Sequence, residues 1–225
     1  MKIELKGVIV SNDDKWIYEY FDIGAVCPRD VIEKIDEAKG ERIDTYINSG
    51  GGDIFAASEI YAALEAYEGE VRHHIVGRAC SAASYIACSG KSDITRTGMI
   101  MIHNVSGGAS GDYHTMDDAS ELLQKANKAI CAAYTHKTGM SEAELLTWMD
   151  AETWMTADEA VKAGFVDEIA KSKNAALAAA QNGLLPADVI EKIRNTVKSP
   201  RQQEADRRTT EAKCRLRILK NGGRK

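Results

Sequence analysis

Short runs of β-branched residues alternate with stretches of helical periodicity through the first 170 residues of the chain. Alternating apolar and polar residues predict strands, whereas apolar residues that recur at helical spacing predict amphipathic helices. The strands expected on this basis are KIELKGVIV, RIDTYIN, VRHHIVG and MIMIH. Strands that alternate with helices are typical of α/β domains. The pattern therefore predicts an α/β domain with a parallel sheet.

The expected helices have recognisable first and last turns. Pro28 fits the first turn of RDVIEKIDEAKG, which Gly40 closes, and RACSAASYIACSG predicts a short buried helix directly after a strand. Capping boxes are expected at Thr115/Asp118, Ser141/Glu144 and Thr156/Glu159. The first box opens the longest helix, roughly residues 115–138, whose apolar stripe is Ala119, Leu122, Leu123, Ala126, Ile130 and Ala133. Such a stripe lies either against the core or against another subunit.

The alternating pattern ends after Ile169. An alanine-rich stretch follows, and then a polar one, interrupted by Gly183, Pro186 and Pro200. We interpret this part as short helices and linker. Its low aromatic content leaves partial disorder and a packed appendage equally open. The chain is therefore divided into a domain at residues 1–170 and a C-terminal tail at residues 171–225, partly disordered or helical.

Charge follows the same division. Residues 171–225 carry 14 Lys/Arg and 5 Asp/Glu, a local charge of +9, whereas residues 1–170 carry 15 Lys/Arg and 29 Asp/Glu, or −14. A strongly acidic body argues against nucleic acid as the main ligand. A basic segment such as RLRILK suits contact with an anionic partner.

Composition narrows the class further. With 44% hydrophobic and 28% charged residues, the chain is typical of soluble globular proteins. No run of about 18 apolar residues is present, and MKIELKGVIV lacks the regions of a secretion signal, so we expect a cytoplasmic protein without membrane contact. Five scattered cysteines have neither disulfide nor zinc spacing, which predicts reduced thiols and no metal or other cofactor.

Two residues are candidates for acyl-transfer chemistry. Ser81 lies in GRACSAAS, where a strand gives way to a helix, so its backbone N–H and that of Ala82 would be free to face a developing oxyanion. His103 ends the apolar run MIMIH, which places it at the carboxyl end of a strand, where the ligand crevices of α/β sheets lie. Taken singly, a helix cap and a structural histidine are the commoner interpretations.

The other candidates are weaker on the same grounds. His73 and His74 lie inside a predicted strand, and His114 and His136 border an exposed helix. The glycine cluster at residues 49–52 is, by itself, more typical of a flexible turn.

Together, the motifs resemble those of the Clp protease proteolytic subunit. They are INSGGGD, GRACSAASYIA, MIHN with its glycine-rich continuation, and ETWMTADEAVKAGFVDEI, in that order over roughly residues 42–169. The variants NSGGGD and MDAETWMTADEA are similar to the phage and prophage branch, the head maturation proteases. The resemblance implies a ClpP/crotonase-like α/β fold with a parallel sheet, flanking helices and a protruding handle helix.

The resemblance also implies a role for each matching residue. Ser81 corresponds to the nucleophile, His103 to its base, and the backbone N–H groups of Gly52 and Ala82 to the oxyanion donors. Ser84 is the nearest competitor for the nucleophile, but the motif register places it one turn too deep.

The third member of the triad departs from the family pattern. Where the family has an aspartate, this chain has Glu152. The glutamate side chain is one methylene longer, so it orients a catalytic histidine only with a shifted backbone or rotamer. Asp150 therefore stays open as a substitute.

Residues 106–113 follow His103, where the family has a strand beside which the substrate peptide lies extended. The resemblance thus gives substrate-binding roles to Gly107 and Gly108 there, and also to Gly51; a mobile glycine loop is the alternative for residues 106–113. By the same resemblance, the helix at 115–138 would be the handle through which homo-oligomeric rings stack.

Several functions compete at this stage. The expected one is a serine endopeptidase that trims capsid or scaffold proteins in the host cytoplasm during phage assembly. A housekeeping subunit that works with an AAA+ unfoldase is the nearest alternative. A crotonase-like acyl-CoA enzyme shares the fold and the oxyanion hole but does not need Ser81 or His103. A non-catalytic ring subunit would also not need them.

Overall fold

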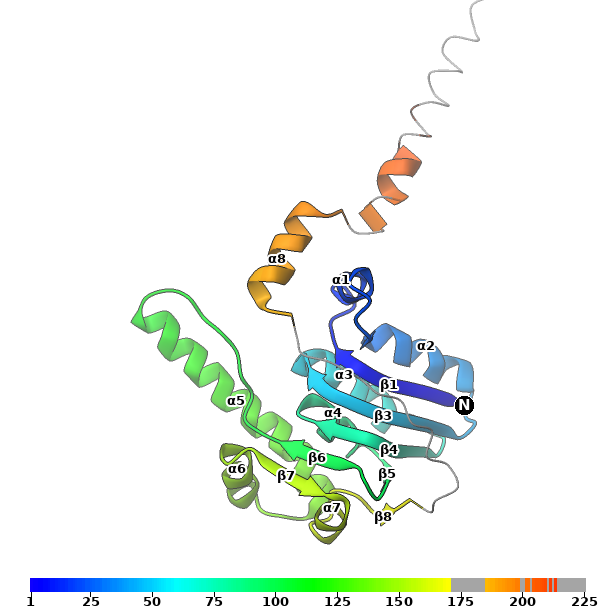
Figure 1. Cartoon of the computed structure of the whole chain (residues 1–225), viewed down its shortest axis with the longest axis vertical. Coiled ribbons are helices and arrows are strands. Elements are labelled where there is room, and N and C mark those ends of the chain that lie inside the picture. Colours follow the sequence, from blue (N-terminus) through cyan, green and yellow to red (C-terminus); the bar gives the residue numbers. More distant parts are fainter. Residues whose placement is uncertain (171–184, 199–200, 203, 210, 212, 214–225) are drawn as a thin grey trace, which may run out of the picture.

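The structure is a computed structural model that describes residues 1–170, 185–198, 201–202, 204–209, 211 and 213. Its centre is one sheet, drawn as arrows in Figure 1. The strands are β1 (Lys2–Ile9), β2 (Ala25–Val26), β3 (Ile43–Gly52), β4 (Val71–Cys80), β5 (Lys91–Ile94), β6 (Met99–Ile102), β7 (Thr153–Thr156) and β8 (Glu168–Ile169).

The sheet is parallel along its main path, in the order β2-β1-β3-β4-β5-β8. The long strand β4 has two neighbours on the same side. Its first half pairs with β5, and its last residues, Arg78 to Cys80, pair with β6. Strand β7 then pairs with β6 in the antiparallel direction. The branch at β6 brings the end of this strand beside the end of β4.

Helices follow the strands in the alternation that the sequence predicts. They are α1 (Lys15–Tyr20), α2 (Pro28–Ala38), α3 (Ile54–Glu65), α4 (Ala82–Ile86), α5 (Tyr113–Thr138), α6 (Glu142–Asp150), α7 (Ala157–Lys162) and α8 (Ala187–Thr196). Figure 1 shows α2, α3 and α4 on one face of the sheet. The buried positions of β1 and β3 alternate with exposed or half-buried ones over most of each strand, so this face carries the core.

Two details of the predicted elements are wrong. The expected helix from Arg78 onward begins later, because β4 continues through Cys80 and the helix starts only at Ala82. The capping box at Thr115 is absent, because Asp112 caps α5 and its carboxylate accepts the Thr115 N–H at 3.1 Å. An aspartate in extended backbone is itself a strong N-cap, so the helix begins two residues earlier.

Two of the other predicted starts agree with the sequence, since Pro28 occupies the first position of α2 and the box of Thr156 with Glu159 is present. The box predicted at Ser141/Glu144 is only half formed. The Ser141 hydroxyl accepts the Glu144 N–H, but within the described residues the Glu144 carboxylate does not accept the Ser141 N–H.

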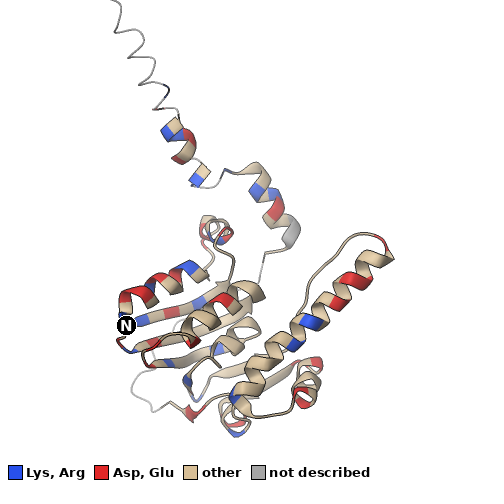
Figure 2. Ribbon diagram, turned by 180° about the vertical axis from the view of Figure 1, so that it is seen from behind, with Lys and Arg blue, Asp and Glu red and all other residues tan. Residues whose placement is uncertain are grey.

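Helix α5 divides into two parts with different surroundings. Its last third contacts the body, where Cys131 and Tyr134 are buried, whereas its first half extends away from it (Figure 1). Leu122, on the predicted apolar stripe, is 59% exposed. Acidic side chains occupy the far part of this helix and basic ones the middle (Figure 2). The protruding helix expected from the resemblance is thus present.

Part of the C-terminal tail packs on the body. Leu185, Ile190 and Ile193 contact a small apolar cluster that includes Ile17 and Tyr18 of α1. Arg194 forms an ion pair with Asp14, and the Leu185 N–H donates to the Tyr18 hydroxyl at 3.3 Å. Residues 171–184 and 214–225 of the predicted tail lie outside the described residues. None of the helices in the described part of the chain has both the length and the apolar character that crossing a bilayer requires.

Candidate active site

Ser81 lies in the tight connection between β4 and α4. Its backbone has φ 54° and ψ −126°, a conformation that residues with a Cβ rarely adopt and that costs on the order of 1–3 kcal/mol. Its N–H donates to the Met101 carbonyl at 2.8 Å, which continues the pairing of β4 with β6. The expectation that the Ser81 N–H is free to face an oxyanion is therefore wrong. The chain therefore turns sharply just past the sheet and presents the Ser81 side chain at its edge. Such strain at one residue is typical of functional positions.

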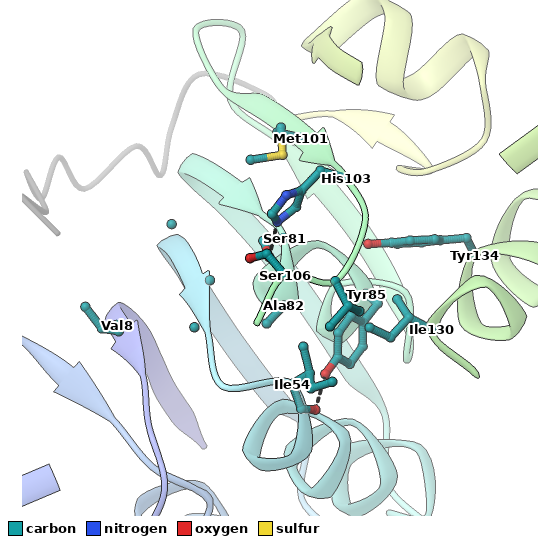
Figure 3. A pocket seen from close by; sticks show the side chains of 14 residues that line it. Val8, Ile54, Ser81, Ala82, Tyr85, Met101, His103, Ser106, Ile130 and Tyr134 are labelled. Atoms are coloured by element: carbon teal, nitrogen blue, oxygen red, sulfur yellow. Dashed lines mark hydrogen bonds between the residues drawn. The ribbon is translucent and has the colours of Figure 1, made fainter. Parts of the chain in front are cut away.

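His103 follows β6 directly, and the register brings it to Ser81. Cys80 pairs with Met101, so both chains leave the sheet side by side. The His103 Nε2 lies 2.7 Å from the Ser81 Oγ (Figure 3). For the serine O–H to donate to Nε2, the imidazole must carry its proton on Nδ1. This is the contact that a general base needs in order to take the proton of a serine nucleophile.

The glycines at residues 51 and 52 belong to the end of β3, so the flexible turn considered for this cluster is wrong. Both have positive φ, 94° at Gly51 and 151° at Gly52. A Cβ on Gly51 would lie 2.7 Å from the Ser81 Cβ and 2.9 Å from the Ala82 N. The Ser49 hydroxyl fixes this segment, since it accepts the Gly51 N–H at 3.0 Å and donates to the Gly7 carbonyl at 2.6 Å. Glycine is therefore required where β3 passes the nucleophile.

A cavity of about 210 Å³ opens beside the Ser81–His103 contact. Gly52 and Ala82, the two predicted oxyanion donors, both line it, as does Gly51. Ala82 is the first residue of α4, and N–H groups in the first helical turn have no partner within the helix. The opposite wall is largely apolar and comes from α3, α4 and α5 (Figure 3); its members include Ile54, Tyr85, Ile130 and Tyr134.

The two carboxylates proposed for the third role make other contacts. Glu152, with φ 48°, is exposed and accepts from the Trp154 indole N–H at 3.2 Å. Asp150 accepts from the Asn104 amide at 2.7 Å. Within the described residues, Ser81 is the hydrogen-bond partner of the His103 ring, and neither carboxylate reaches it. The structure thus brings together the first two members of the predicted triad and leaves the third open.

Ser84 lies where the motif register places it, below the nucleophile. It is 1% exposed, and its hydroxyl is occupied by the Ser81 carbonyl and the Tyr134 hydroxyl, each at 2.6 Å. Cys80, on the other side of Ser81, is buried, and burial raises the pKa of its thiol to about 11. A thiol that stays protonated at neutral pH is a poor nucleophile. Neither neighbour therefore competes with Ser81.

The predicted substrate-binding loop is exposed. Gly107 and Gly108 are exposed and belong to a segment without regular secondary structure, while Val105 and Ser106, just before them, reach the cavity. The start of this segment is fixed to α5, because the Asn127 side chain accepts the Val105 N–H at 2.7 Å.

Two residues of α5 support the site without belonging to a recognisable sequence motif. Asn127 and Tyr134 both come from α5 and contact the segments that carry His103 and Ser81, respectively. Their spacing of seven residues puts them on one helix face, which was the available signal, but an asparagine and a tyrosine among apolar residues give no specific motif.

The cysteines and the possible metal ligands can be located in the described residues. Burial of the cysteines agrees with the sequence, since Cys27, Cys80, Cys88 and Cys131 are free thiols inside the protein; Cys214 lies outside the described residues. Among the residues that the structure describes, no three His, Cys, Asp or Glu side chains gather as metal ligands would.

The structure resembles a solved member of one fold family. A ClpP1 mutant from Listeria monocytogenes superimposes with a TM-score of 0.63, over 76% of this chain and 92% of that one, at 19% identity. At this identity the likeness concerns the fold alone. The chain accordingly has a ClpP-like α/β fold, in which a parallel sheet with flanking helices brings a serine and a histidine together at one edge.

Sequence comparison then gives the family. Residues 31–173 match the Clp protease family. Two ATP-dependent Clp protease proteolytic subunits from strains of Bacteroides fragilis are 31% identical over 133 residues, which make up 58% of this chain. The matched part covers 64% of one of these relatives and 60% of the other, so the chain spans less than two-thirds of their length. This chain belongs to the Clp protease family, a family of serine peptidases.

Proposed function

We propose that this protein is a serine endopeptidase of the ClpP type, which hydrolyses peptide bonds through an acyl-enzyme on Ser81. The observation that carries the proposal is the 2.7 Å contact between the Ser81 Oγ and the His103 Nε2, beside a cavity lined by Gly52 and Ala82. Nucleophile, base and backbone donors are the three parts that acyl transfer to serine needs.

In this mechanism His103 removes the proton of Ser81 as the Oγ attacks the peptide carbonyl carbon. The negative charge that develops on the carbonyl oxygen is stabilised by the backbone N–H groups of Gly52 and Ala82. His103 next gives the proton to the leaving amine, the C–N bond breaks, and an ester on Ser81 remains. A water molecule, deprotonated by His103, then hydrolyses this ester and restores the serine.

Glu152 is the proposed third member of the triad. For this role its carboxylate has to leave the Trp154 indole and accept a hydrogen bond from the Nδ1–H of His103, which keeps the imidazole in the productive tautomer. Asp150 is the alternative. Gly51, Gly107 and Gly108 are proposed to pair with the backbone of an extended peptide substrate.

The finer role that we propose is maturation of phage or prophage heads, with capsid or scaffold proteins as substrates and a homo-oligomeric ring as the working form. The motif variants NSGGGD and MDAETWMTADEA favour it. A housekeeping protease that works with an AAA+ unfoldase stays the alternative, favoured by the names of the Bacteroides fragilis relatives. A crotonase-like reaction or a non-catalytic ring subunit would leave the Ser81–His103 contact without a use.

The test is hydrolysis of a fluorogenic peptide by the full chain and by Ser81→Ala. We expect this substitution to abolish turnover and leave the assembly intact, because the Ser81 hydroxyl has a chemical rather than a packing role. Ser120→Ala, at an exposed position of α5, is the matched control and should retain wild-type turnover. Equal turnover by the wild type and Ser81→Ala would refute the proposed nucleophile.

A further inference from the structure

A chain of three hydrogen-bonding groups runs from helix α5 to the nucleophile. The Tyr134 hydroxyl lies 2.6 Å from the Ser84 Oγ, and the Ser84 Oγ lies 2.6 Å from the carbonyl oxygen of Ser81. Tyr134 and Ser84 are each 1% exposed, so water does not compete for these contacts. The three residues come from α5, α4 and the strained connection before α4.

The chemistry of the groups fixes the direction of both bonds. The Ser81 carbonyl has no hydrogen, so the single hydroxyl hydrogen of Ser84 must point to it. Tyr134 must then be the donor to the Ser84 oxygen. Burial holds the pKa of Tyr134 well above its usual range, so its hydroxyl keeps the proton.

This series of hydrogen bonds ends on Ser81, the residue whose backbone is strained. The Ser81 carbonyl also accepts the Ser84 N–H, at 2.9 Å, and so receives two hydrogen bonds from one residue. A residue at φ 54° keeps that conformation only when its surroundings over-determine it. The second bond, from the Ser84 hydroxyl, contributes to that constraint.

Packing makes Tyr134 a rigid anchor. Its ring contacts Phe165, with the ring centroids 5.5 Å apart, and Phe165 in turn stacks on Trp148. The position of the hydroxyl therefore follows the position of helix α5 on the body.

We propose that Tyr134 and Ser84 are positioning residues, which fix the backbone of Ser81 so that its Oγ stays in line with His103, and which link helix α5 to the reactivity of the site. This inference rests on the proposed peptidase function. Neither residue touches the substrate carbonyl in this role. Both act through the Ser81 main chain.

The test compares Ser84→Ala, Tyr134→Phe and the double variant in the full chain, with kcat and KM for a fluorogenic peptide and the rate of labelling by a fluorophosphonate probe. We expect each single variant to lower kcat about tenfold, with KM changed less than twofold and labelling slowed in parallel. Because both residues act through the same series of hydrogen bonds, kcat of the double variant should fall no further than kcat of the more affected single variant. Tyr134→Phe keeps the ring packing, so the test does not depend on Ser84→Ala folding.

The matched controls are Ser89→Ala and Tyr18→Phe. Ser89 also donates its hydroxyl to a helix carbonyl, that of Ile86, and Tyr18 is likewise fully buried, but neither contacts Ser81. Both controls remove a hydrogen-bonded hydroxyl, so they should lower the melting temperature and leave kcat unchanged. Wild-type kcat in Ser84→Ala and Tyr134→Phe, or a multiplicative loss in the double variant, would overturn the proposed positioning. If the wild-type chain itself neither reacts with the probe nor cleaves peptide, the proposed function fails, and the positioning role with it.

Discussion

At the scale of single residues, Gly51 is the glycine that lies directly against the nucleophile. An added Cβ would lie 2.7 Å from both the Cys80 carbonyl oxygen and the Ser81 Cβ, at a backbone φ of 94°. We expect Gly51→Ala to lower peptide turnover at least 100-fold and the free energy of unfolding by about 1–3 kcal/mol, since strand and nucleophile must separate. Gly24→Ala, where an added Cβ meets no atom within 4 Å, is the control for both measurements. Wild-type turnover in Gly51→Ala would mean that this close approach has no catalytic importance.

The third catalytic role is also decided by single residues. If the Glu152 carboxylate orients His103 during turnover, Glu152→Gln should lower kcat by up to the order of 10⁴, the effect of the corresponding change in a serine protease triad. Asp150→Asn should have a much smaller effect, because its carboxylate contacts Asn104. Steady-state kinetics of the two variants distinguishes the roles. The reverse ranking would transfer the role to Asp150, and no effect from either would indicate a dyad or a water.

At the scale of elements, a charged cluster joins three neighbouring strands. His74 of β4 contacts Asp44 of β3 through Nε2, at 3.0 Å, and Asp93 of β5 through Nδ1, at 2.9 Å. The hydrogen bond to Asp93, followed by that to Asp44, raises the pKa of His74 above its ordinary value of 6.5 despite partial burial. Burial opposes the shift at both carboxyls, but their hydrogen bonds to His74 and to neighbouring arginines prevail and lower the pKa values of Asp44 and Asp93 below 3.8.

The signs of these shifts give a pH dependence. The raised pKa of His74 means that its contribution is fully present below about pH 6.5 and is lost as the pH rises through the folded value. The contributions of Asp44 and Asp93 are present above about pH 3.8 and are lost as the pH falls through their lower folded values. Buried His73, whose pKa burial lowers to about 3, has the opposite pH dependence, so the contribution of His74 is read from the difference between a variant and the wild type. In denaturant unfolding, His74→Gln should lower the free energy of unfolding more at pH 5.5 than at pH 8.5, whereas His136→Gln, at an exposed position of α5, should change it equally little at both. An equal loss at both pH values in His74→Gln would contradict the pKa shift of this side chain.

Elements with a strong pattern could be predicted from the sequence, and short ones could not. Strands such as RIDTYIN alternate over most of their length, so their place in the chain follows from the pattern. Strands β5, β7 and β8 have only two to four residues, and their partners lie far away in the chain, so no local signal identifies them. Helix α1 could not be predicted either, because it has only six residues, KWIYEY, and three of them are aromatic.

The site follows the same rule. Ser81 and His103 are 22 residues apart, and their contact depends on β6 pairing with the last residues of β4. The family motifs implied the pair, whereas composition and periodicity alone did not. The contacts of α5 with Ser84 and with Val105 depend on side chains whose place only the folded chain determines.

At the scale of the whole molecule, the catalytic residues and the tail lie in separate parts of the chain. Every proposed site residue precedes Ala170, but α8 packs on the apolar cluster of α1 and β1. A chain that ends at residue 172 should cleave a small peptide about as fast as the full chain. Its free energy of unfolding should fall by about 2–4 kcal/mol, because the aliphatic side chains of α8 lose their packing.

The same truncation should slow the processing of the proposed capsid or scaffold target. The tail carries a charge of +9, whereas the body carries −14, so an anionic segment of the target would bind to the tail and not to the body. Contacts between such charges weaken as salt rises, which gives a second measurement. Loss of peptide cleavage or dissociation of the assembly after truncation would place the tail in the structural core, and the proposed boundary at residue 170 would be wrong.

The assignment of Ser81 as the nucleophile is tested by the site of covalent labelling by a fluorophosphonate, mapped by mass spectrometry of the digested protein. We expect one adduct, on Ser81, that forms quickly in the wild type and slowly in His103→Ala, since the base activates the nucleophile through the 2.7 Å contact. A label on Ser84, or no label under conditions that modify a known serine peptidase, would contradict this assignment.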